Sequence, residues 1–365
     1  MTRLATSRGT LYPSPVPARP TQPVLIRSTA EFARYVGLSR STVSRALNGH
    51  GDLRPKSMER IQAAIQATGF TPNAHALHLR GRRSAMVGVC MENFLTPTAV
   101  AKVSALQQGL RDAGLVALIE VLEPGASQKT LEHFRSLRVE AVVFIGHFET
   151  AELAARITEL DRHGTPHLVI DSVGVRRANT VSLDRTQAMA DVVTRLHALG
   201  HRRFGLLGLS GNFQTVADRL TGIHRAVTEL GLDPAASLLA YDHLHARRDH
   251  FEYGAVLAQE FLQHAPRPTA FIAVNDETAV GALLHFQAAG LSVPRDFSMV
   301  GFNNQNICLM TRPALSSVDQ QIAETARIAV EILTRQIARP FTTRPLHRLV
   351  RPKFVDRGSI GPAGA

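Results

Sequence analysis

Cysteine is scarce in this chain, since Cys90 and Cys308 are the only two among 365 residues. Two thiols are too few for a disulfide framework or for a four-cysteine zinc site. The 16 histidines are scattered along the chain, and we predict no metal site from them. The cysteine content therefore predicts a reduced, intracellular setting.

Long apolar runs and nucleotide-binding loops are missing as well. No segment approaches the roughly 20 apolar residues of a membrane span, and the N-terminus lacks the apolar run of a signal peptide. Residues 205–211 have glycines three apart but not the Gly-x-Gly-x-x-Gly pattern, and no Gly-Lys-Ser/Thr phosphate loop occurs. We expect a cytoplasmic protein without a membrane partner, a cofactor or catalytic activity.

Acidic residues are rare at the N-terminal end. Residues 1–84 contain 13 lysines and arginines against 3 acidic residues, a net charge of +10. The remaining 281 residues contain 28 basic against 27 acidic residues, a net charge of +1. Such a localised positive charge is typical of a segment that binds a polyanion, with nucleic acid as the first expectation and anionic lipid as the second.

Helix signals follow a proline-rich start. Five prolines within residues 1–27 predict a disordered leader. Beyond it, the capping and stop residues predict three short helices: Ser28 or Thr29 and Gly37 for the first, Ser39 for the second, and Pro55 and Gly69 for the third. Three short helices with a tight first turn predict a helix-turn-helix domain over residues 28–71.

From Met86 onward, apolar runs of five or six residues alternate with amphipathic helical stretches. This alternation predicts an α/β fold with parallel sheets covered on both faces. The length allows two such sheets, and we place the division between two lobes near Gly200. Residues 85–355 would form this domain, and residues 356–365 would form a tail without the leucine heptads of a further association site.

Six stretches, taken together and in order, resemble the lac repressor family of bacterial transcription regulators. They are residues 36–49, 68–81, 199–208, 218–227, 268–302 and 312–321. The resemblance implies an all-α helix-turn-helix headpiece, a hinge helix with linker at residues 72–84, and a periplasmic-binding-protein-like domain that binds an effector and dimerises. It also implies a repressor of carbohydrate or related catabolic genes. Activation, and an effector that tightens or releases DNA, remain open alternatives.

The resemblance assigns DNA contacts to two regions. The N-terminal half of a recognition helix enters the major groove, and the matching positions for base contacts are Arg40, Ser41 and Arg45. Thr42 and Ser44 would contact phosphates. In the hinge, the matching residues are Ala76, Leu79 as a minor-groove wedge, and Arg80 as a phosphate contact. The alternatives are a solvated helix face for the arginines and simple linker packing for Leu79.

The resemblance also places an effector between the lobes. The matching positions are Arg219, Asn275, Asn303, Gln320 and Thr98, whereas we expect Asp276 to cap a helix. Hydrogen-bonding side chains of this kind suit a hydroxyl-rich molecule such as a sugar.

Two departures from the family pattern favour an atypical effector. Thr96-Pro97-Thr98-Ala99 stands where the family has Asn-Pro-Phe-Phe, and Asn303 replaces an aspartate. These changes point to a sugar acid, a phosphorylated sugar or another unusual effector paired with Arg219.

A homodimer would match a pseudo-palindromic DNA operator, because a two-fold protein reads a two-fold site. A tetramer is the less favoured assembly. The rival interpretation, a solute-binding protein of the same fold without a DNA role, would require export.

Overall fold

A computed structural model describes residues 26, 28–47, 53–70, 84–92, 96–122, 127–172, 175, 177–209, 214–241, 250–263, 267–339 and 344–364. The chain divides into two compact units, Met1–Ser84 and Ala85–Ala365. Most of the expected leader and hinge helix lies outside the described residues, and so do Ala76, Leu79 and Arg80.

Three helices make up the described part of the first unit: α1 (Thr29–Val36), α2 (Arg40–Leu47) and α3 (Pro55–Thr68). Ser28 caps α1, because its hydroxyl accepts the Glu31 N–H at 3.1 Å. The helix ends at Gly37, whose φ of 65° lies in the left-handed region that favours glycine. Gly69 ends α3 in the same conformation. The predicted start and stop residues therefore do bound these helices.

The core of the first unit is small and tightly built. Phe32 of α1 stacks on Phe70 with ring centroids 4.2 Å apart, and Val43 of α2 is fully buried beside them. Ile26, which the sequence assigned to the leader, packs against this core. The ordered packing therefore begins before residue 28.

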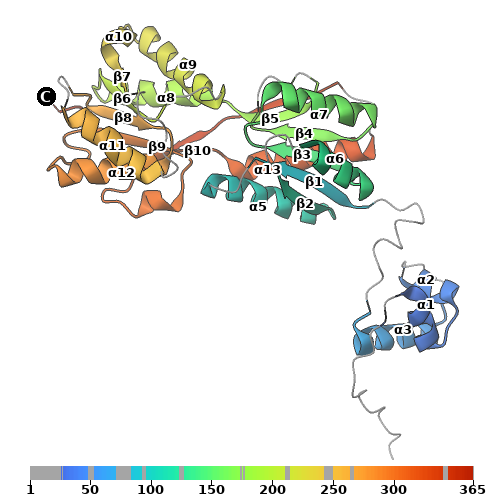
Figure 1. The fold of residues 1–365 in the computed structure, drawn as a ribbon. Coiled ribbons are helices and arrows are strands. Elements are labelled where there is room, and N and C mark those ends of the chain that lie inside the picture. The colour runs from blue at the N-terminus through green and yellow to red at the C-terminus, as the bar shows by residue number, and fades with distance from the viewer. Residues whose placement is uncertain are drawn as a thin grey trace, which may run out of the picture. The chain divides into compact units, whose positions relative to one another are not determined.

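The second unit contains two lobes, each with a sheet between helices (Figure 1). The first sheet has the order β11-β5-β4-β3-β1-β2 and is entirely parallel. Its strands are β1 (Met86–Met91), β2 (Val116–Val121), β3 (Ala141–Ile145), β4 (His167–Ile170), β5 (Asn179–Leu183) and β11 (His347–Val350). Apolar residues of α5 (Pro97–Asp112) and α13 (Ile322–Ala338) pack on one face, and those of α6 (Ser127–Ser136) and α7 (Thr150–Arg162) on the other.

The second sheet has the order β12-β10-β9-β8-β6-β7, in which only the β10–β12 pair is antiparallel. Its strands are β6 (Phe204–Leu207), β7 (Leu238–Ala240), β8 (Ala270–Ala273), β9 (Ser298–Phe302), β10 (Ser316–Asp319) and β12 (Lys353–Val355). The helices are α8 (Arg185–Ala198), α9 (Gln214–Glu229), α10 (Pro234–Ser237), α11 (His250–Gln263), α12 (Asp276–Ala288) and the 3-10 turn η1 (Asn306–Leu309). This architecture confirms the predicted headpiece joined to two sheet lobes, both dominated by parallel strands.

The chain passes between the lobes three times, after β5, after β10 and after β11. Apolar residues of α8 join the core of the second sheet. The first crossing therefore falls at Asp184, and our expected division near Gly200 was wrong. The error arose because α8 follows a strand of one lobe but buries its apolar face against the other.

The expected tail is also part of the second lobe. Ser359 is completely buried, and its carbonyl accepts the Met299 N–H at 2.8 Å. Ala363 donates its N–H to the Leu199 carbonyl at 2.8 Å. These backbone contacts hold residues 356–364 against the lobe, so the domain extends beyond residue 355.

Cys90 and Cys308 are both buried and unpaired. Among the helices that the structure describes, none is long and apolar enough to cross a membrane.

Candidate functional site

Helix α2 carries the side chains that the sequence assigned to DNA. Arg40, Ser41 and Arg45 are exposed, while Thr42 and Ser44 are half-buried. The hydroxyl of Ser39 caps the helix by accepting the Thr42 N–H at 3.1 Å, as predicted. All five candidate residues therefore lie on a short, capped helix, with their polar groups at its surface.

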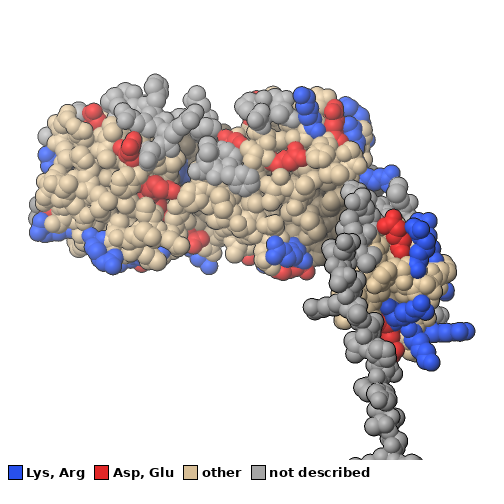
Figure 2. Space-filling model, turned by 60° about the horizontal axis from the view of Figure 1, so that its bottom comes forward, with Lys and Arg blue, Asp and Glu red and all other residues tan. Residues whose placement is uncertain are grey.

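Positive charge dominates the surface of this unit. Its described residues include six lysines and arginines, Arg34, Arg40, Arg45, Arg54, Lys56 and Arg60, and all are exposed. The described acidic residues are Glu31 and Glu59. Figure 2 shows basic side chains projecting from the three-helix unit. Such a surface attracts a polyanion over long range.

A cavity of about 360 Å³ lies in the second unit, within the size range of small-molecule sites. Both lobes line it, through residues that follow the carboxyl ends of strands and through the first turns of helices. Ligands of open parallel sheets bind at this edge, because the loops there converge. All five predicted effector residues line the cavity: Thr98, Arg219, Asn275, Asn303 and Gln320.

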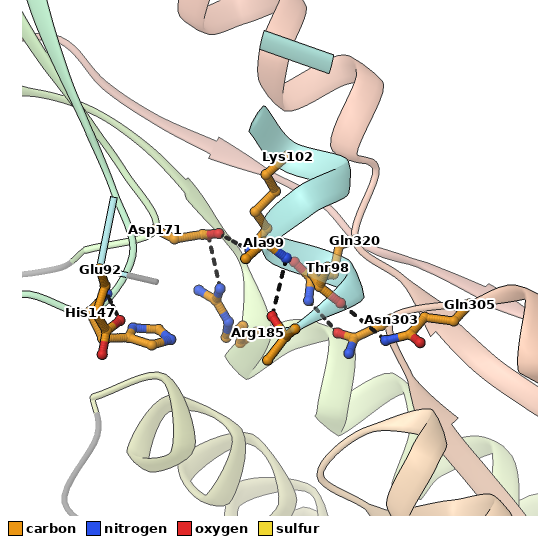
Figure 3. Close-up of polar contacts among 11 residues, drawn as sticks. Glu92, Thr98, Ala99, Lys102, His147, Asp171, Arg185, Asn303, Gln305 and Gln320 are labelled. Atoms are coloured by element: carbon orange, nitrogen blue, oxygen red, sulfur yellow. Dashed lines mark hydrogen bonds and ion pairs between the residues drawn. The ribbon is translucent and has the colours of Figure 1, made fainter. Parts of the chain in front are cut away.

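The amide side chains of the second lobe form one wall of the cavity. Gln320 donates its Nε2–H to Oδ1 of Asn303, while Oε1 of Gln320 is buried without a hydrogen-bond partner among the described residues (Figure 3). Oδ1 of Asn275 accepts the Thr278 N–H at 2.8 Å and caps α12. The cap is therefore Asn275, and our assignment of this role to Asp276 was wrong.

Asp276 instead organises the loop behind this wall. It is fully buried, and its carboxylate accepts the Gln305 N–H at 2.7 Å and the Ser317 hydroxyl at 2.6 Å. Burial raises the pKa of Asp276 to about 6, although these hydrogen bonds oppose the shift. Its hydrogen bonds fix the strand ends from which Asn303 and Gln320 reach the cavity.

Sequence reasoning missed a buried cluster of charges at the cavity. Asp171 follows β4, is 2% exposed, and pairs with Lys102 of α5 and, at 2.9 Å, with Arg185 of α8 (Figure 3). The two cations hold the pKa of Asp171 below its usual range against the opposing effect of burial. Burial in turn lowers the pKa of Lys102.

Two local signals could have revealed this cluster. Lys102 interrupts the apolar stripe of α5, between the packed residues Ala99 and Val103. Arg185 begins α8, where the helix dipole disfavours a cation. A charge in an apolar stripe and a cation at a helix start both indicate a local partner.

Arg219 lies on α9 and lines the cavity. Its guanidinium donates to the Val274 carbonyl at 2.6 Å and lies 3.8 Å from the centroid of the Phe302 ring. Burial and the nearby charge of Arg185 lower the pKa of Arg219 to about 9. The ring and the carbonyl orient the guanidinium, while its Nε is buried without a partner among the described residues.

Two polar contacts connect the lobes across the cavity. Asp171 of the first lobe pairs with Arg185 of the second, and Thr98 accepts a hydrogen bond from Gln305 Nε2 at 3.2 Å (Figure 3). Apolar side chains such as Met91, Ile145 and Val216 also line the cavity, but no Phe, Tyr or Trp occurs among the described lining residues. The described residues also contain no cluster of three or more His, Cys, Asp or Glu that could hold a metal.

Comparisons with known proteins match both units. Residues 30–73 match the model of bacterial regulatory proteins of the lacI family, and residues 193–360 match the periplasmic binding protein-like domain. Catabolite control protein A of Priestia megaterium is 26% identical over 316 residues, which cover 84% of this chain and 91% of that protein.

Solved structures show the same fold. The lac repressor dimer bound to operator and the anti-inducer ONPF has a TM-score of 0.78 at 22% identity, covering 93% of this chain and 99% of that one. The transcriptional regulator CelR in complex with cellobiose has a TM-score of 0.64 at 23% identity, covering 92% and 100%.

A basic helix-turn-helix unit joined to a two-lobed domain with a polar cavity defines the class of ligand-responsive transcriptional regulators. Within this class, residues 30–73 carry the DNA-binding domain of the lacI family of bacterial regulatory proteins, and residues 193–360 a periplasmic binding protein-like domain.

Proposed function

We propose that this protein represses carbohydrate or related catabolic genes by binding an operator in double-stranded DNA, and that a small molecule in the cavity controls the binding. One observation carries the proposal: an exposed, basic, capped helix occurs in the same chain as a polar cavity lined by two lobes. A solute-binding protein of the same fold would need the cavity but not the helix. The protein would act in the cytoplasm, where the chromosomal DNA lies.

Arg40, Ser41 and Arg45 would read base edges in the major groove, and Thr42 and Ser44 would contact phosphates. The exposure of the two arginines and the burial of Val43 behind them support this division. Leu79 and Ala76 would contact the minor groove from the hinge, and Arg80 would contact a phosphate beside it. A hydrophobic side chain such as Leu79 can unstack a base step there and kink the duplex.

The effector would be a sugar or a sugar derivative. Thr98, Asn275, Asn303, Gln320 and Arg219 surround the cavity with amide, hydroxyl and guanidinium groups, which are suitable partners for hydroxyls. A molecule bound between them would contact both lobes at once. It would therefore change the relative energies of open and closed lobe arrangements, which is the differential binding that allostery requires.

A homodimer would present two copies of α2 to the two halves of a pseudo-palindromic operator. The structures that share this fold include a repressor dimer on its operator, which supports this assembly.

The test is the selection of genomic DNA fragments by the full-length protein at moderate salt, followed by sequencing of the retained fragments. We expect enrichment of a few palindromic sites that lie beside catabolic genes. The matched control is the double variant Arg40→Ala/Arg45→Ala, which should lose this enrichment while keeping its fold. If the wild-type protein enriches no site, with or without added metabolites, the proposed operator binding is wrong and the binding domain alone carries the function.

A further inference from the structure

We propose that the cavity binds a small hydroxylated anion, either a carboxylic acid or a phosphate ester, through Arg185 together with Arg219. This inference rests on the proposed function, because it names the chemical class of the effector. It adds Arg185, a residue that the family positions do not include, as the main anion contact.

Two of the three side-chain nitrogens of Arg185 have no hydrogen-bond acceptor among the described residues. Its side chain is 2% exposed and lines the cavity, and its Nη2 pairs with Asp171 at 2.9 Å. Its Nε and Nη1 are buried without a hydrogen-bond partner among the described residues. Buried donors without acceptors are costly, and a guanidinium presents its donors in a planar fork that matches a carboxylate or phosphate. The free nitrogens of Arg185 therefore suit an anionic group of a ligand.

The packing of α8 on α9 brings Arg219 to the same place. Gly222, one turn beyond Arg219, approaches so closely that a Cβ there would lie 2.1 Å from the Thr186 carbonyl oxygen. The Thr186 hydroxyl donates to the Asp218 carbonyl at 3.1 Å. These contacts involve the neighbours of both arginines in the sequence, so they fix the backbone segments that carry the two arginines relative to each other.

The local charges leave room for an anion. Lys102, Arg185 and Arg219 line the cavity together with the carboxylates Asp171, Glu92 and Glu277. Asp171 pairs with Lys102 and Arg185, whereas Arg219 forms no ion pair among the described residues. The same four side chains determine the electrostatic environment of His147, whose pKa is lowered by burial and by the three cations, while Asp171 raises it. Arg219 is buried without an ion pair among the described residues, so an anionic group of a ligand would stabilise it.

Acceptor oxygens of the cavity fit the rest of such a ligand. Oε2 of Glu92 accepts the His147 N–H at 2.9 Å, and it lies on the first-lobe wall. Oε2 of Glu277 and Oε1 of Gln320 are buried acceptors without a partner among the described residues. Hydroxyl groups would satisfy these acceptors, whereas a simple inorganic anion would not. The site thus matches a molecule that carries both an acid group and hydroxyls.

The experiment measures the unfolding temperature of the full-length protein with matched ligands at constant ionic strength. The probes are D-glucose, D-glucuronate, D-glucose 6-phosphate and inorganic phosphate. We expect at least one of the two anionic sugars, D-glucuronate or D-glucose 6-phosphate, to raise the unfolding temperature more than D-glucose and inorganic phosphate do. Comparison of glucuronate with glucose 6-phosphate shows whether the acid group is a carboxylate or a phosphate.

Variants assign the effect to Arg185. In Arg185→Gln, the rise caused by the acid should disappear. It should persist in Arg195→Gln, a control on the same helix whose side chain is 52% exposed. If Arg185→Gln does not fold, Arg185→Lys keeps the charge but loses the planar fork, and calorimetry should show binding weaker by about tenfold or more.

Three results would overturn the proposal: an equal or larger effect of D-glucose, no effect of either anionic sugar, or a full effect in a folded Arg185 variant. None of these results affects the outcome of the genomic DNA selection, which tests the proposed function separately. If the protein enriches palindromic sites but binds neither anionic sugar, the proposed function stands and only the proposed effector class is wrong.

Discussion

The residue scale is dominated by charges that are buried in the second unit. Asp171 and Asp276 are both carboxylates with an exposure of 2% or less, yet their surroundings shift their pKa values in opposite directions. Asp171 has two cationic partners, which stabilise the charged form. Asp276 has only hydrogen bonds, so burial raises its pKa to about 6. The partner, rather than the residue type, decides which form is stable.

The raised pKa of Asp276 predicts a pH-dependent stability. Between about pH 4 and pH 6 the folded protein holds a proton on Asp276 that the unfolded chain releases, so this group's contribution falls as pH rises. A shift of about two units corresponds to about 3 kcal/mol at most. We expect Asp276→Asn to lose this dependence. Denaturant unfolding at pH 4.5 and pH 7 measures the free energy of unfolding of both proteins. The value for the variant should rise relative to the value for the wild-type protein as pH rises, and a difference that is the same at both pH values would contradict the prediction.

Arg45 tests the role of α2. If Arg45 makes a bidentate contact with a base, Arg45→Ala should weaken binding to the selected operator by about 1 to 3 kcal/mol, or roughly fivefold to 150-fold. Arg34→Ala removes an equally exposed arginine from α1 and should have a small effect. Fluorescence anisotropy with the operator at one salt concentration measures both. Equal losses would indicate a general charge effect instead of base reading.

At the scale of elements, the start of α8 links the cavity to the core of the second lobe. Asp184 caps the helix, Arg185 turns into the cavity, and the apolar residues that follow pack on the sheet. Close approach of α9 to this first turn depends on a glycine, because no side chain fits between the two backbones. The packing of α8 on α9 therefore determines where Arg185 and Arg219 lie in the cavity wall.

Gly222→Ala tests this coupling. The added Cβ would lie 2.1 Å from the Thr186 carbonyl, so one helix must shift. Overpacking of this kind costs about 1 to 3 kcal/mol, and the displaced arginines should also weaken the response to sugar acids. Gly364→Ala makes the same change where the nearest atom is 3.5 Å away, and it should alter neither property. Thermal unfolding with and without the acid measures both effects, and equal behaviour of the two variants would refute the argument.

For the whole molecule, the distribution of charge separates two tasks. The first 84 residues carry a net charge of +10, and the remaining 281 carry +1. Long-range attraction to DNA therefore belongs to the first unit, while the second unit can bind a small ligand without competing for the polyanion.

Operator binding should consequently fall steeply with salt, because contacts with phosphates release counterions. For about six phosphate contacts, the logarithm of the binding constant should decrease with a slope of about −5 against the logarithm of the salt concentration. Titrations of the operator between roughly 50 and 200 mM salt measure the slope. A binding constant that does not depend on salt would contradict the assignment of the basic unit to DNA.

Local signals in the sequence determined much of this protein. Ser28, Gly37, Pro55 and Gly69 act within one helical turn, so their effect on the chain does not depend on the tertiary fold. The apolar runs likewise determined the strands and the two-sided burial of the sheets, because each run must leave water wherever it lies.

Only the tertiary structure decided which of these elements meet. The placement of α8 in the second lobe, the packing of residues 356–364 and the cap at Asn275 depend on partners far away in the sequence or on competition between adjacent residues. The cluster of Lys102, Asp171 and Arg185 needs three elements to converge. A buried charge is stable only beside its counter-charge, and that proximity is a property of the folded chain.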